Sequence, residues 1–88
     1  LQPNSASYED TYAWVLYKQG NYNDAKTWLE KALQNGASNN GTILEHYGDV
    51  LYKLGRIQEA VDQWQKAKIT GEPLPLIDKK INDRKLYE

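Results

Sequence analysis

His46, the single histidine of the chain, is its clearest candidate for a catalytic residue. His46 follows Glu45 and precedes Asp49 by three residues, a spacing that places imidazole and carboxylate on one helix face. Such a pair could act as a general base or contribute to a metal site, but both roles need further partners. Because the sequence supplies none, we expect an exposed helical histidine beside a carboxylate. Hydrolysis assisted by His46 and Asp49 is the enzymatic alternative.

No other residue pattern points to chemistry. The 88 residues include no Cys, which excludes a disulfide framework, a thiol nucleophile and a cysteine-based zinc site. The sequence also lacks a glycine-rich phosphate loop, a nucleophile elbow and a cluster of metal ligands. We therefore expect a protein without enzymatic activity, cofactor or bound metal.

Three Trp and seven Tyr could stack on the bases of a nucleic acid. The charge argues against that function, since eleven Lys and Arg against twelve Asp and Glu give a net charge of −1. Trp28 and Trp64 are instead expected to pack in the core. No apolar run approaches the ~18 residues of a membrane-spanning helix. We expect a soluble protein that binds neither nucleic acid nor membrane, and its compartment stays open.

An internal repeat predicts the helices that carry these residues. Residues 12–25 match residues 47–60, so that Tyr, Val, Leu, Tyr, Lys, Gly and Ala recur in register. Each unit is long enough for two helices and a turn. Gly20 and Gly55 follow periodic runs, at the place where a helix favours a left-handed closing residue. The pattern predicts two helical hairpins.

Small residues recur where the helices of each hairpin should meet. Ala25 and Ala60 are placed opposite the small residues Ala13 and Gly48, so that the paired helices can approach closely. Large residues are expected to pack around these gaps. Enlarging Ala60 to Leu should therefore cost on the order of 1–3 kcal/mol through overpacking.

This arrangement resembles the tetratricopeptide repeat, whose period is about 34 residues. The resemblance covers roughly residues 6–71 and rests on Ala13 and Gly48, Tyr17 and Tyr52, Gly20 and Gly55, Ala25 and Ala60, and Ala32 and Ala67. It implies an all-α solenoid of about five helices, with one repeat over residues 6–36 and the next over residues 41–71. The period here is longer by one residue, which the polar, glycine-rich segment 35–41 is expected to absorb.

The helix starts and the chain's beginning add to this expectation. Ser7 with Asp10, and Thr42 with Glu45, have the spacing of a capping box. Residues 1–5 resemble the closing segment of a preceding repeat, which implies a longer array. The amino-acid sequences of residues 10–14 and 45–49 resemble those of the last repeats of long arrays in Gram-negative bacteria. That resemblance implies a bacterial protein of the periplasm or cytoplasm.

A further helix is expected after the second repeat. Glu72-Pro73-Leu74-Pro75 breaks the repeat pattern, and proline is tolerated in a first helical turn. We predict a helix over residues 74–87, with Leu74, Ile77 and Ile81 on one face. A solenoid must cover its last apolar face, so this helix is expected to be a cap. A partner-binding helix is the alternative.

The resemblance also implies where a partner binds. In tetratricopeptide arrays the first helix of each hairpin lines the concave face, which here carries Asp10, Trp14, Tyr17, Lys18, Glu45, Asp49, Tyr52 and Lys53. Family members that bind acidic chaperone tails have basic groove residues, whereas this groove would be acidic. We therefore expect no binding of such tails. A peptide with basic or aromatic groups should bind instead, and charge reversal at Glu45 and Asp49 should abolish its binding.

These expectations converge on a non-catalytic protein-interaction module, a scaffold whose concave surface binds a peptide or protein. The alternative is a structural cap of a longer solenoid whose binding site lies upstream. Loss of an upstream repeat would uncover apolar surface near Tyr8, Tyr12 and Val15. Weak self-association through that end is therefore expected.

Overall fold

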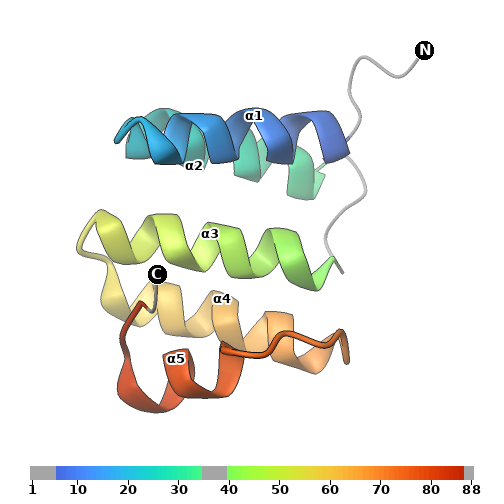
Figure 1. Ribbon diagram of the computed structural model, residues 1–88, viewed down its shortest axis with the longest axis vertical. Helices are drawn as coiled ribbons and strands as arrows, with labels where there is room; N and C mark the ends of the chain where they lie inside the picture. The colour runs from blue at the N-terminus through green and yellow to red at the C-terminus, as the bar shows by residue number, and fades with distance from the viewer. Residues whose placement is uncertain (1–5, 35–39, 87–88) are drawn as a thin grey trace.

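The computed structural model describes residues 6–34 and 40–86. Within these ranges the chain forms helices and no strand: α1 (Ala6–Lys18), α2 (Tyr22–Ala32), α3 (Gly41–Lys53), α4 (Ile57–Ile69) and α5 (Ile77–Asp83) (Figure 1). The all-α prediction with five helices is confirmed. The segment 1–5, expected to close a preceding repeat, lies outside the described residues, as does most of the 35–41 segment.

The helices form two stacked hairpins. α1 packs against α2 and α3 against α4, and α3 also contacts both helices of the first hairpin (Figure 1). α5 packs on α4 at the other end of the stack. The molecule measures 40 × 28 × 18 Å, an elongated shape that follows from stacking along one direction.

Both hairpins turn in the same way. Gly20 and Gly55 have φ angles of 83° and 82°, in the left-handed region that favours glycine. The N–H of Asn21 donates to the carbonyl of Leu16 at 2.9 Å, and the N–H of Arg56 donates to that of Leu51 at the same distance. These are the closing hydrogen bonds of a Schellman turn, and they confirm the expected role of both glycines.

The small residues lie where the paired helices approach each other. Ala25 and Ala60 are fully buried, and Ala13 is 1% exposed. A Cβ on Gly48 would lie 2.5 Å from the Trp64 ring and 3.0 Å from the carbonyl oxygen of Ala60. The buried Trp64 therefore fills the space that the missing side chain leaves, and close approach through small residues is confirmed.

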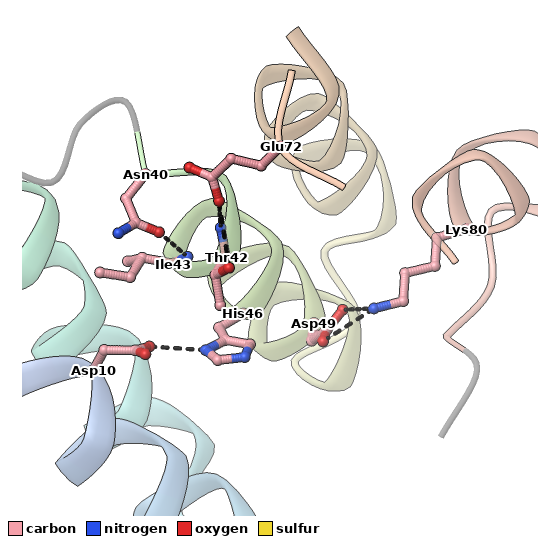
Figure 2. Close-up of polar contacts among 8 residues, drawn as sticks. All are labelled: Asp10, Asn40, Thr42, Ile43, His46, Asp49, Glu72 and Lys80. Atoms are coloured by element: carbon pink, nitrogen blue, oxygen red, sulfur yellow. Dashed lines mark hydrogen bonds and ion pairs between the residues drawn. The ribbon is translucent and has the colours of Figure 1, made fainter. Parts of the chain in front are cut away.

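The start of α3 differs from the expected capping box. Asn40 is the N-cap, and its side chain accepts a hydrogen bond from the N–H of Ile43 at 3.1 Å (Figure 2). The remaining donors are met from the loop after α4, where the Glu72 carboxylate accepts from Gly41 N–H at 2.8 Å and Thr42 N–H at 3.3 Å. The Thr42 capping box is wrong, because a carboxylate 30 residues away satisfies these groups. The Ser7 capping box is wrong as well, because α1 begins at Ala6 and Ser7 therefore lies within the helix.

α5 is shorter than the predicted helix over residues 74–87. It starts at Ile77, after a turn at residues 75–76, and Pro75 disfavours a helical conformation for Leu74. It ends at Asp83, since Arg84 adopts a left-handed conformation with φ of 51°. Ile77 is buried and Leu74 and Ile81 are half-buried against α4 and its neighbours, as the apolar pattern predicted.

Candidate functional site: a groove between α1, α3 and α5

The hairpins and α5 enclose one groove that contains most of the predicted binding residues. Its cavity of about 260 Å³ is lined by Trp14, Tyr17, Lys18, Glu45, His46, Asp49, Lys80 and Leu86. Five of the eight predicted residues are therefore brought together here: Trp14, Tyr17, Lys18, Glu45 and Asp49. Asp10 lies beside the groove, in contact with His46. Tyr52 stacks on Trp64 at the far end of α3, and neither Tyr52 nor Lys53 lines the cavity.

A stack of three aromatic rings forms one wall of the groove. Trp14 lies between Tyr17 and His46, with ring centroids 4.7 Å and 4.3 Å away and nearly parallel planes. The Lys18 ammonium lies 5.3 Å from the Trp14 ring centroid. Because its neighbours come from both hairpins, Trp14 is held in one orientation while a minor part of its surface stays exposed.

His46 pairs with the first hairpin. Its Nδ1 lies 2.8 Å from Oδ1 of Asp10, and both side chains are about one-fifth exposed (Figure 2). The expected exposed histidine beside Asp49 is therefore wrong: His46 is half-buried against Trp14, and its carboxylate partner comes from α1. His46 and Asp10 are 36 residues apart in the sequence, so sequence spacing does not predict their contact. The contact forms because α1 and α3 lie side by side.

The two carboxylates of α3 that line the groove are bound by a lysine from α5. Lys80 Nζ donates to Glu45 Oε2 at 2.7 Å. It also donates to the two Asp49 oxygens at 3.0 and 3.2 Å (Figure 2). The indole N–H of Trp64 also donates to Asp49, at 3.1 Å. Burial raises the pKa of Asp49, while the Lys80 ammonium and the indole N–H oppose that rise.

Lys80 lines the groove but is not among the binding residues predicted from the sequence. It follows Ile77 by three residues and precedes Ile81, so helical spacing alone places it on the buried face of α5. The consequence for the groove is large. The expected acidic surface is neutralised within the chain, since Lys80 and Lys18 balance Glu45 and Asp49 among the lining residues.

The arrangement has the features of a recognition surface. In the described part of the chain, no group of three His, Asp or Glu residues could hold a metal ion. None of the described helices is long and apolar enough to cross a membrane. The groove combines an aromatic wall, one exposed ammonium and a buried ion-pair network.

Comparison with known proteins identifies the family. The family model described as "Anaphase-promoting complex, cyclosome, subunit 3" matches residues 1–67. The chain belongs to this family. It is a tetratricopeptide-like repeat family, in agreement with the resemblance carried by the repeated small and aromatic residues. No curated protein matches the chain closely enough to count as a relative.

Membership of this family assigns the chain to the protein-interaction scaffolds, which are typically non-catalytic. The family's description concerns the subunit of the complex that it names. For the present chain, the match establishes the repeat architecture over both hairpins, up to Ala67 in α4.

Proposed function

We propose that this chain is a non-catalytic interaction module whose partner docks in the groove between α1, α3 and α5. The supporting observation is Trp14, a large aromatic side chain that lines the cavity, is partly exposed and stacks on Tyr17 and His46. Pre-organised aromatic side chains are typical binding hot spots, because little conformational entropy is lost when a partner covers them.

The partner expected for this groove is a peptide or protein segment with aromatic or basic groups. An aromatic side chain would pack against the exposed part of the aromatic wall, whereas a basic side chain would reach Glu45 and Asp49 only by displacing Lys80, which already donates to both. Acidic chaperone tails fit poorly, since Lys18 is the one exposed cation among the residues that line the cavity.

Site-specific photo-crosslinking tests this function. A benzoyl-phenylalanine at position 18, at the rim of the groove, should crosslink the partner in cells. The same group at Gln65, an exposed position on α4, serves as the matched control and should not crosslink it. Trp14→Ala should abolish the crosslink from position 18. Equal crosslinking from both positions, or an unchanged yield in the Trp14 variant, would contradict the proposal.

A structural function is the second candidate. One observation favours it: Lys80 already donates hydrogen bonds to the two α3 carboxylates in the groove, Glu45 and Asp49. In that case the chain closes a longer solenoid whose binding site lies upstream. A comparison of this chain with a longer array separates the two functions. Binding by the longer array alone would favour the structural one, and equal binding by both would favour the groove.

A further inference from the structure

Lys80 is bound in a way that resembles recognition of a ligand. The residue is only 4% exposed, and lysine is almost never buried to this extent unless its charge is paired. Its ammonium donates to three oxygens, one from Glu45 and two from Asp49. The Trp64 ring centroid lies 5.9 Å away. Glu45, Asp49 and Trp64, here called the lysine cradle, all belong to the second hairpin.

The occupant of the cradle, in contrast, belongs to the short helix α5. α5 has seven residues, too few for a helix that is stable without tertiary contacts. Besides Lys80, its docking rests on Ile77 and its apolar neighbours and on an ion pair between Lys68 and Asp78. Both side chains of that pair are more than half exposed, so it contributes little.

We propose that the lysine cradle is a recognition site for a lysine side chain, and that Lys80 fills it as an intramolecular competitor. A partner lysine then enters the groove when α5 moves away. The cradle suits lysine better than arginine, because a compact ammonium directs its three donors to three converging oxygens, whereas a planar guanidinium presents a wider fork. This inference rests on the proposed function only in assuming that a partner uses the same groove.

Chemical rescue tests the cradle without any partner. Lys80→Ala removes the ammonium, and n-butylammonium restores the same charge on a stem of four carbons. Its binding should raise the Tm of the variant saturably, by roughly 5–10 °C at ten times its dissociation constant. The indole N–H resonance of Trp64 should shift along the same binding curve. n-Butanol, the uncharged analogue, should produce neither effect.

Two controls locate the binding. Wild-type chain should not respond to n-butylammonium, because its cradle is filled, and Lys85→Ala, at an exposed position after α5, should behave as wild type. If Lys80→Ala does not fold unaided, recovery of helicity in circular dichroism becomes the readout, since binding to the folded state shifts the equilibrium. Equal responses to the amine and the alcohol, or equal responses of variant and wild type, would overturn the proposal.

The competition itself is tested with an Ile77→Ala variant, which loosens α5 and leaves the cradle intact. The probes are acetyl-Leu-Lys-Leu-amide and its uncharged norleucine counterpart. The lysine peptide should bind Ile77→Ala at least fivefold more tightly than it binds wild type, and the norleucine peptide should bind neither. Equal affinities for the two chains would refute α5 as a competitor. Rescue that succeeds while crosslinking through Trp14 fails would overturn the proposed function alone.

Discussion

At the scale of single residues, polar pairs join elements that are distant in sequence. Tyr47 of α3 donates its hydroxyl to Glu30 of α2 at 2.7 Å, and Lys26 lies 3.0 Å from the same carboxylate. Burial and the hydrogen bond to Glu30 raise the pKa of Tyr47. Burial also raises the pKa of Glu30, but the hydrogen bonds from Tyr47 and Lys26 outweigh this effect, so the pKa of Glu30 is lowered.

The Tyr47–Glu30 pair makes stability depend on pH at both ends of the scale. The raised pKa of Tyr47 stabilises the fold below the unfolded value near 10, and this contribution is lost as the pH rises further. The lowered pKa of Glu30 stabilises it above the unfolded value of 4.5, and this contribution is lost as the pH falls. Tyr47→Phe should cost about 1–2 kcal/mol near pH 7. In urea titrations the difference from wild type should shrink towards pH 3 and pH 11; a constant difference would contradict the pair's role.

Asp49 should matter for folding as well as for binding. Asp49→Lys would place two ammonium groups in the buried cradle, so we expect a loss of about 3–5 kcal/mol. Charge reversal here therefore cannot serve as a simple binding test. Lys18→Glu, on the exposed rim of the same groove, should change stability by less than about 0.5 kcal/mol. Urea denaturation compares the two, and equal losses would show that burial of the Lys80 network is unimportant.

At the scale of elements, α3 packs so closely against α4 that a Cβ at position 48 has no room. Gly48→Ala adds helix propensity, about 1 kcal/mol in an exposed helix. Here the new methyl group would meet the fully buried Trp64 ring at 2.5 Å, so the ring or the helix must shift. We expect a net destabilisation of about 1–3 kcal/mol, as for Ala60→Leu. Thermal unfolding measures both, with exposed Gln65→Ala as control; a stabilised Gly48→Ala would contradict the packing.

The loop after α4 should stabilise the first turn of α3. Glu72→Gln removes the negative charge from the carboxylate that accepts from Gly41 and Thr42, at the positive end of the helix dipole. The expected cost is about 1 kcal/mol. Amide hydrogen exchange at Gly41 and Thr42 should accelerate, while exchange in the middle of α1 stays the same. Exposed Glu59→Gln is the matched control, and unchanged exchange at Gly41 would remove this role of Glu72.

At the scale of the whole molecule, the first hairpin presents an exposed apolar surface at one end of the stack. Tyr12 and Val15 of α1 are 49% and 47% exposed, and the Tyr12 ring packs edge-on against Trp28. Tyr8 belongs to α1, but its side chain is not described. An uncovered solenoid end of this kind favours contact with another molecule.

We expect weak self-association through this end. Sedimentation equilibrium should show a concentration-dependent mass, and Val15→Lys should return the chain to a monomer. Ile69→Lys is the matched control, because Ile69 of α4 is 83% exposed but far along the stack from α1. A monomer at all concentrations would refute the expectation. Loss of association in the Ile69 variant instead would move the interface to the second hairpin.

The sequence by itself determined the architecture. Gly20 and Gly55 close two helices in the same left-handed conformation, and Ala25, Ala60 and Gly48 permit close approach. These are local requirements on one residue or on neighbouring helices of one hairpin, so periodicity and residue size reveal them. The resemblance to the tetratricopeptide repeat implied that Trp14, Tyr17, Glu45 and Asp49 share one face, and all four line the same groove.

Only the tertiary structure decided how the groove is charged and which side chains are paired. His46 meets Asp10, Glu72 meets the start of α3, and Lys80 meets Glu45 and Asp49, each across 30 residues or more. Ion pairs and hydrogen bonds require donor and acceptor to meet within about 3 Å, and such geometry depends on how the hairpins and α5 are stacked. The composition gives the number of charged residues in a chain, but the folded structure determines which of them are accessible to a partner.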